Sequence, residues 1–270
     1  MSAIDSEIAL AGRSDTGVIR REPPTLADHW TPIFIIASPR PSTGKTFLAR
    51  ILANFLQVDG RDVKAFEVGQ NETSLSKFLP EKTSKSDISS TQGQMALFDQ
   101  LVIDDGVAKI VDVDHALFGR FFALVEQIGF MSESNGRTID PMILFPADSH
   151  PDSVREYANL RRRMPDAVLV PVFNEAIARG RKLRDQYAFS RAAAVPLQIP
   201  LLPPGLKPLA ERSGFVLADL YARASTQVPQ GPATELCSWT RRTFLEFREL
   251  ELRLLLEKLR ASLQDSLGAH

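Results

Sequence analysis

The chain has 270 residues, of which 44% are hydrophobic and 24% are charged. These proportions describe an ordinary soluble globular chain, long enough for one α/β domain with appendages. The formal net charge of −1 argues against a gross electrostatic attraction to nucleic acid and leaves room for local basic patches. A single cysteine, Cys237, excludes an internal disulfide framework, and no apolar run reaches the roughly 20 residues of a membrane span. We therefore expect a cytoplasmic protein without a membrane span.

After residue 31, apolar runs alternate with segments of helical periodicity. Several runs are continuously apolar, which is typical of strands covered on both faces. This alternation predicts an α/β fold with a doubly wound, mainly parallel sheet and right-handed crossovers. The predicted strands are Ile33–Ala37, Val63–Val68, Lys109–Val113, Pro141–Pro146, Ala167–Phe173 and Leu197–Leu201, and the predicted helices are Thr43–Leu56, Gly93–Asp104, His115–Phe130 and Ser153–Arg163.

Composition divides the chain into three segments. Residues 1–31 mix Ser, Asp, Arg, Gly and Pro without a period, and we expect a flexible arm. Residues 32–205 carry the α/β pattern, although Asn71–Ser90 is rich in polar residues and is expected to be a loop, either a switch-like element or a plain connection. Residues 206–270 form a C-terminal extension. Its segment Thr234–Ser266 predicts a long amphipathic helix that packs on the domain or pairs with a partner.

A phosphate-binding pattern lies between the first predicted strand and the first predicted helix, in the sequence Ser38-Pro39-Arg40-Pro41-Ser42-Thr43-Gly44-Lys45-Thr46. In a strand, loop and helix of this kind, backbone N–H groups and the helix dipole favour bound phosphate. Lys45 is then expected to reach the β- and γ-phosphates, and the Thr46 hydroxyl to hold Mg²⁺. The alternative is a structural turn with Lys45 solvated. The candidate nucleotide-binding residues are Arg40, Pro41, Ser42, Thr43, Gly44, Lys45, Thr46 and Phe47.

The loop departs from the usual G-x-x-x-x-G-K-[ST] pattern, because Pro39 stands where the first glycine is expected. It resembles the deviant Walker A motif, K-G-G-x-x-K-[ST], of ParA/MinD-like P-loop NTPases of the SIMIBI class. Arg40 matches the first lysine of that motif, which reaches a nucleotide across a dimer interface, whereas Pro41 and Ser42 replace two glycines. Proline has no N–H and fixes φ near −65°, so a phosphate donor is lost. The alternative for Arg40 is a solvated loop residue.

Acidic residues follow two other predicted strands. Asp112, at the end of Lys109–Val113, resembles a Walker B carboxylate and is the candidate for holding Mg²⁺ together with Thr46. The alternative is that either aspartate only caps the helix that begins near His115, which suits Asp114 particularly well. Glu67, near the end of Val63–Val68, matches the first acid of a D-x-D-like element in ParA/MinD proteins and is similar to a glutamate of StbB-type plasmid-stability proteins. It is a candidate for positioning magnesium or the attacking water, or else a surface carboxylate.

Asn174 closes the fifth predicted strand. The resemblance to ParA/MinD proteins implies that its amide hydrogen-bonds the adenine edge, which needs both a donor and an acceptor. The alternative is a turn or helix cap. Two basic clusters occur at Arg161–Arg163 and Arg179–Arg184. We expect each to be a solvated helix face, and the alternative is a surface that binds the phosphates of DNA.

The resemblance spans residues 32–174 and implies ATP and Mg²⁺ as ligands and possible slow ATP hydrolysis, with Lys45, Glu67 and Arg40 as the catalytic candidates. It further implies a nucleotide-dependent homodimer that partitions, mobilises or positions DNA or protein cargo, as in plasmid partition or conjugation. Two alternatives stay open. One is a P-loop small-molecule kinase or phosphotransferase, with arginines such as Arg161–Arg163 on a lid. The other is a nucleotide-binding fold that does not hydrolyse ATP.

Overall fold

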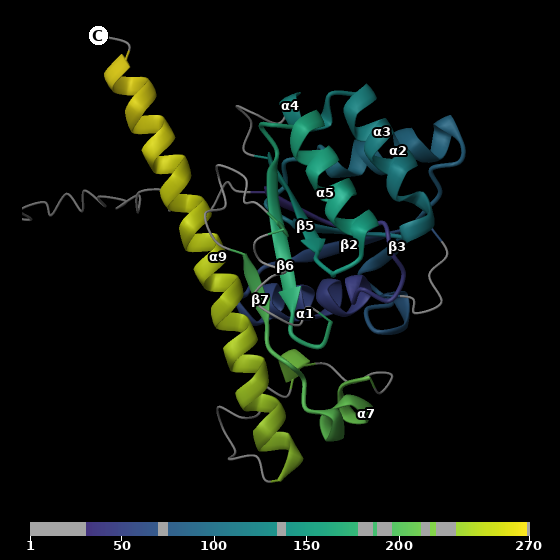
Figure 1. Ribbon diagram of the computed structural model, residues 1–270, viewed down its shortest axis with the longest axis vertical. Coiled ribbons are helices and arrows are strands. Elements are labelled where there is room, and N and C mark those ends of the chain that lie inside the picture. Colours follow the sequence, from purple (N-terminus) through teal and green to yellow (C-terminus); the bar gives the residue numbers. More distant parts are fainter. Residues whose placement is uncertain are drawn as a thin grey trace, which may run out of the picture.

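The computed structural model describes residues 31–69, 75–133, 139–177, 186–187, 196–211, 217–219 and 231–268. These residues form one seven-stranded sheet, in the order β3-β2-β4-β1-β5-β6-β7, and every neighbouring pair of strands is parallel (Figure 1). The α/β class and the mainly parallel sheet are confirmed. The strands are β1 (Thr31–Ile36), β2 (Val63–Val68), β3 (Thr83–Ser86), β4 (Ala108–Val113), β5 (Ile139–Pro146), β6 (Val168–Asn174) and β7 (Leu197–Ile199).

β1 lies at the centre of the sheet, between β4 and β5, and all of its residues are buried. Alternate side chains point to opposite faces. Ile33 and Ile35 join the core on one face, whereas Phe34 and Ile36 join the core on the other. The sequence of β1 is continuously apolar because both of its faces are covered.

Helices cover each face of the sheet. One core is formed with α1 (Lys45–Val58) and α9 (Pro232–Gly268). The core on the other face is formed with α2 (Thr91–Leu101), α3 (Phe118–Gln127) and α5 (Pro151–Arg163), which lie together in Figure 1. Shorter elements complete the described fold, namely η2 (Leu75–Lys77), η3 (His115–Leu117), α4 (Phe130–Glu133), η4 (Pro204–Leu206) and α7 (Lys207–Ala210).

α9 packs its first half against α1 and β7. Phe55 of α1 lies 5.5 Å from Phe244 and 5.3 Å from Phe247, measured between ring centroids. The buried indole of Trp239 donates from Nε1 to the carbonyl of Pro200 at 3.0 Å, directly after β7. The C-terminal part of α9 extends beyond the sheet (Figure 1). No described helix meets the combined length and hydropathy that a bilayer-spanning segment requires.

The polar segment 71–90 contains a strand that the sequence pattern did not reveal. β3 has the sequence Thr-Ser-Lys-Ser and pairs only with β2, at the edge of the sheet. An edge strand is solvated along one side, so it needs no apolar alternation. The expectation of a loop over Asn71–Ser90 is therefore wrong for residues 75–77 and 83–86, while residues 70–74 lie outside the described part of the chain.

Candidate functional site

The candidate residues gather at the carboxyl edge of the parallel sheet. The loop that joins β1 to α1 follows the central strand, Asp112 belongs to β4, and Glu67 belongs to β2. Asn174 ends β6, on the other side of β1. Ligands of open parallel sheets bind at this edge, where the strand order changes direction along the chain. The topology thus brings together residues that are far apart in the sequence.

The β1–α1 loop requires glycine at its last position. Gly44 has a φ of 82°, in the left-handed region that disfavours side chains. A Cβ atom at Gly44 would lie 3.1 Å from Nδ2 of Asn174, so any side chain there meets the end of β6. Ser42 also has a positive φ, of 56°. Pro41 and Ser42 are exposed, which leaves the outer side of the loop open to a ligand.

Lys45 is buried and folds back over its own loop. Its Nζ donates to the carbonyl oxygen of Arg40 at 2.8 Å. Burial lowers the pKa of Lys45, and the attraction of Asp112 and Asp114 opposes that shift. The alternative of a solvated lysine at the start of α1 is therefore wrong. The Lys45 ammonium thus has an acceptor in its own loop and two carboxylates near it.

Thr46 and Asp112 are joined by a short hydrogen bond. The Thr46 hydroxyl donates to Oδ2 of Asp112 at 2.6 Å, whereas Oδ1 of Asp112 is buried without a hydrogen-bond partner. Burial raises the pKa of Asp112 to about 6, although the Thr46 hydrogen bond and the Lys45 charge oppose the rise. A water molecule of a hydrated cation would supply the hydrogen bond that this buried carboxylate oxygen lacks.

Asp114 caps the helical turn that follows β4, as expected. Its Oδ1 accepts from the backbone N–H of Ala116 at 2.9 Å, and its side chain lies 2.9 Å from Nδ1 of His115. Asp112 and Asp114 thus have different local partners, although they are only two residues apart. The first faces Thr46 across the sheet edge, and the second stabilises the start of η3.

Asp114→Ala is expected to lower the free energy of unfolding by about 0.5–2 kcal/mol, the usual effect of losing an N-cap. Chemical denaturation of both proteins at pH 7 measures the change. Ser90→Ala is a matched control, because Ser90 caps α2 by accepting from Gly93 N–H at 3.1 Å and lies outside the site. Nucleotide affinity should fall no more for Asp114→Ala than for Ser90→Ala. A stability loss for Ser90→Ala alone would contradict the capping role of Asp114.

Glu67 lies beside Asp112 in the sheet register and is buried, which excludes a surface carboxylate. Its Oε1 accepts from the backbone N–H of Leu75, in η2. The negative charge of Glu67 is one of the smaller contributions that raise the pKa of Asp112. Glu67 therefore fastens the segment after β2 to the carboxyl edge of the sheet, and this contact had no signal in the sequence.

Asn174 makes a local capping contact and also lies next to the β1–α1 loop. Its Oδ1 accepts from the backbone N–H of Ala176 at 3.0 Å, which is the local turn-capping contact. Its Nδ2 is the atom nearest to an added Cβ at Gly44. The side chain thus borders the phosphate-loop candidate and keeps its amide group at the sheet edge. Phe47, in the first turn of α1, instead packs its ring 5.9 Å from that of Trp239.

Arg40 forms an ion pair within its own chain. Its Nε lies 3.5 Å from Oδ2 of Asp148, in the loop between β5 and α5. These two residues, with Ser149, His150 and the exposed loop residues, line a cleft of about 440 Å³ beside the β1–α1 loop. The volume lies in the range of small-molecule sites. Asp148 comes two residues after the predicted strand Pro141–Pro146, and no pattern in the sequence indicates its arginine partner.

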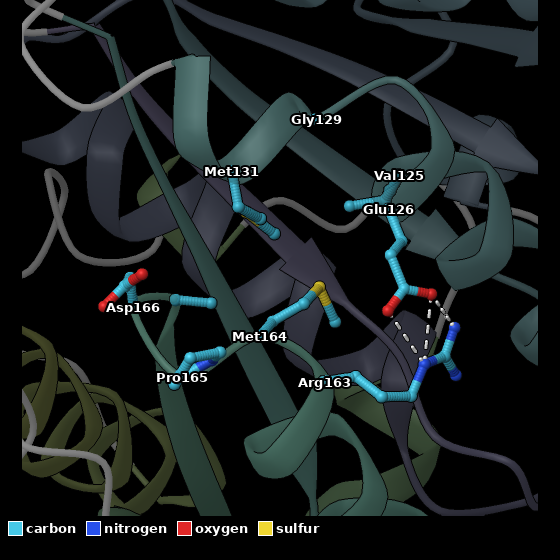
Figure 2. A pocket seen from close by; sticks show the side chains of 9 residues that line it. Val125, Glu126, Gly129, Met131, Arg163, Met164, Pro165 and Asp166 are labelled. Atoms are coloured by element: carbon cyan, nitrogen blue, oxygen red, sulfur yellow. Dashed lines mark hydrogen bonds and ion pairs between the residues drawn. The ribbon is translucent and has the colours of Figure 1, made fainter.

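A second hollow lies at the opposite edge of the sheet, between the ends of α3 and α5 and the start of β6 (Figure 2). Its volume is about 90 Å³, below the range of small-molecule sites. Arg163 closes one side by binding the carboxylate of Glu126, with Nε 3.1 Å and 3.2 Å from its two oxygens. With the arginine already paired, this hollow is a poor candidate for an anionic ligand.

The cluster Arg161–Arg163 is far from the candidate site. α5 begins beside Asp148 at the carboxyl edge of the sheet, and its 13 residues place the arginines at the other end, about 20 Å away. Arg163 binds Glu126 and Arg162 donates to Asn159. This position argues against a phosphate-contacting lid. The second basic cluster, Arg179–Arg184, lies outside the described residues.

No protein-family model matches this chain, and no curated protein matches it. Among the described residues, no group of three His, Cys, Asp or Glu side chains is placed to hold a metal ion. The chemistry of the site is therefore argued from Lys45, Thr46 and Asp112 themselves.

Proposed function

We propose that the β1–α1 loop is a phosphate-binding loop and that the chain binds ATP with Mg²⁺. The single observation that carries this proposal is the convergence of Lys45 and Thr46, at the start of α1, on Asp112 of β4. The helix N-terminus supplies further positive potential at the same place. A phosphate group would replace the Arg40 carbonyl as the acceptor for the Lys45 ammonium.

The residues present fit Mg²⁺ bound together with a nucleotide. Mg²⁺ in nucleotide sites is held by one or two protein oxygens, with the phosphates and water providing the other ligands. The Thr46 hydroxyl would be the protein ligand, and the unpartnered Oδ1 of Asp112 would accept from the water shell. When bound, Mg²⁺ supplies positive charge that offsets the charge of the phosphates.

ATP hydrolysis is a separate property from ATP binding, and a module that binds ATP without hydrolysing it is a second candidate function. Two features favour this second candidate. Pro41 removes one backbone donor from the loop, and the Glu67 carboxylate is already engaged with the Leu75 N–H. A ParA/MinD-like ATPase that moves DNA or protein cargo in plasmid partition or conjugation is supported by the resemblance of the Arg40–Thr46 motif. Measuring phosphate release at saturating ATP distinguishes the two.

Calorimetric titration of the full chain with ATP, in the presence and absence of Mg²⁺, tests the proposal. We expect one site per chain and tighter binding with Mg²⁺. AMP should bind more weakly than ATP, because the loop addresses the β- and γ-phosphates. If ATP and AMP bind equally, or neither binds at millimolar concentration, the phosphate-loop assignment is wrong.

Arg40 is expected to support a nucleotide-dependent homodimer by leaving Asp148 and contacting phosphate on the facing subunit, where a guanidinium binds two oxygens. Addition of a non-hydrolysable ATP analogue should raise the mean mass of the wild-type protein in light scattering. For Arg40→Ala the increase should be lost while calorimetric ATP affinity changes less than about tenfold. Arg155→Ala is a matched control. Arg155 is also an ion-paired arginine and lies near the start of α5, the helix that follows Asp148, but it does not line the cleft.

An equal increase in mass for Arg40→Ala and the wild type would place Arg40 outside the interface. So would a wild-type mass that does not change at saturating analogue. Both results leave the nucleotide titration standing, because that titration measures binding and not assembly.

A further inference from the structure

The outer side of α9 exposes an unusual number of leucines. Among the exposed large hydrophobic side chains of the described residues, six are leucines of this helix, with exposed fractions from 42% to 63%. They are Leu245, Leu252, Leu255, Leu256, Leu259 and Leu263. We call them the outer leucines. Isolated exposed leucines need no explanation, but a continuous set on one helix marks an interaction surface.

The outer leucines follow the spacing of a coiled coil. Leu252, Leu256, Leu259 and Leu263 are separated by four, three and four residues, and Leu245 lies one heptad before Leu252. This is the a/d repeat of a two-helix seam, with Glu249 as its only polar position between residues 245 and 263. The seam is about 27 Å long at 1.5 Å per residue.

The domain covers a different side of the same helix. Phe247, Leu250 and Leu254 are buried in the core shared with α1. Each of them lies two residues before a seam position, which is about 200° around a helix with 3.6 residues per turn. The seam therefore faces away from the domain. A second helix can lie on it without displacing any core contact.

We propose that a second copy of this chain covers the outer leucines, with its α9 antiparallel to the first. Charge decides the orientation. A parallel pair in register would place Glu249 against Glu249 of the second copy within the seam, which is repulsive. The antiparallel arrangement separates these two carboxylates. The arginines that flank the seam do not decide the orientation, because Arg248 binds Asp59 and Arg253 binds Glu249 within their own chain.

An antiparallel register pairs nearly all of the outer leucines. Leu245 faces Leu263 of the second copy, Leu252 faces Leu256, and Leu255 meets its own counterpart near the two-fold axis. Glu249 faces Leu259 of the second copy, and the next residue, Arg260, offers it a positive charge. Such a two-fold contact is isologous, so one set of residues serves both chains.

This dimer is distinct from the nucleotide-dependent one. Trp239, near the start of α9, contacts Pro200 at the carboxyl edge of the sheet, whereas Lys258 binds Asp140 at the opposite edge with Nζ and Oδ2 2.7 Å apart. α9 thus runs from the candidate nucleotide site to the other edge. Antiparallel pairing places the two nucleotide sites at opposite ends of the assembly and leaves both clefts open.

Sedimentation equilibrium of the full chain without nucleotide tests the proposal. Protein concentrations of about 1–100 μM are suitable, because weak dimers dissociate in this range. We expect a concentration-dependent dimer in the wild type. Leu252→Glu with Leu256→Glu should raise the dimer dissociation constant at least 100-fold. Met95→Glu is the matched control, because Met95 of α2 and Leu252 are both 60% exposed, and its dimer should be unchanged. Circular dichroism confirms that every variant is folded.

Cysteine cross-linking tests the orientation. In a Cys237→Ala background, an equimolar mixture of Leu245→Cys and Leu263→Cys proteins should form a disulfide dimer, whereas neither protein alone should do so. Cross-linking by each protein alone would indicate a parallel pair and overturn the proposed arrangement.

Three results would overturn the proposal as a whole. They are a wild-type monomer at every concentration, a dimer that persists in the Leu252→Glu, Leu256→Glu protein, and a monomer that binds anionic lipid vesicles through these leucines. None of these results depends on ATP binding. The proposed nucleotide site and the proposed α9 dimer can therefore fail separately.

Discussion

Lys45→Ala should lower the affinity for Mg·ATP by about 100-fold, because a hydrogen bond to a charged group contributes about 1.5–3 kcal/mol. The ammonium is buried and is held by the Arg40 carbonyl in the absence of ligand, so it is already placed where phosphate is expected to bind. Removing it leaves the backbone donors of the loop but takes away the ammonium that contacts the loop. Calorimetric titration of ATP into both proteins measures the loss.

Lys109→Ala is the matched control for this change. Lys109 is also a buried lysine of the sheet, but its Nζ donates to the carbonyl of Ile103 and to Asp105, at the amino edge of the sheet. Its loss should lower stability and leave nucleotide affinity unchanged at temperatures where the variant is folded. Equal ATP affinities for wild type and Lys45→Ala would remove the phosphate-loop proposal.

Much of the fold was predictable because the sheet is parallel and covered on both faces. Buried strands such as β1 and β4 must be apolar along their whole length, and this makes them visible as continuous runs. The position of Gly44-Lys45-Thr46 between a strand and a helix also follows from the sequence. Because β1 and β4 are parallel neighbours, Thr46 and Asp112 lie at the same edge of the sheet, where they form a hydrogen bond.

The contacts that could not be predicted join segments with no shared local pattern. β3 is polar because it is an edge strand, and its sequence does not distinguish it from a loop. The Glu67 contact with Leu75 and the Arg40 contact with Asp148 depend on how loops fold over the sheet edge. The helix over Thr234–Ser266 was predictable from its leucines. Which leucines face α1 and which stay exposed depends on the angle at which α9 meets the sheet.

Asp112 connects the stability of the protein to the chemistry of the site. Its carboxylate is buried, and one of its oxygens has no hydrogen-bond partner. Without a ligand, the ionised form is disfavoured, and this is why the pKa is raised. In the proposed Mg·ATP complex the same charge becomes favourable. A single substitution should therefore change stability and ligand affinity in opposite directions.

Asp112→Asn should stabilise the protein at pH 8 in the absence of nucleotide and Mg²⁺. The folded-state pKa of about 6 lies above the usual value of 3.8 for an unfolded aspartate, so the folded state holds the proton more tightly. The free energy of unfolding of the wild type should thus decrease as the pH rises from about 4 to above 6, by up to about 3 kcal/mol at 1.36 kcal/mol per pKa unit. The asparagine variant retains an acceptor for the Thr46 hydroxyl and lacks this dependence.

Urea denaturation at pH 4.5 and pH 8, without ligand, measures the difference. The variant should gain stability over the wild type at pH 8 and lose most of that gain at pH 4.5, while its Mg·ATP affinity at pH 8 falls at least tenfold. Asp105→Asn is a control of opposite sign. Although burial opposes the shift, hydrogen bonds from Lys109 and Val107 N–H hold the pKa of Asp105 below its usual value, so its removal should destabilise the protein at pH 8. Parallel pH profiles for wild type and Asp112→Asn would show that the carboxylate is not held in the buried state described here.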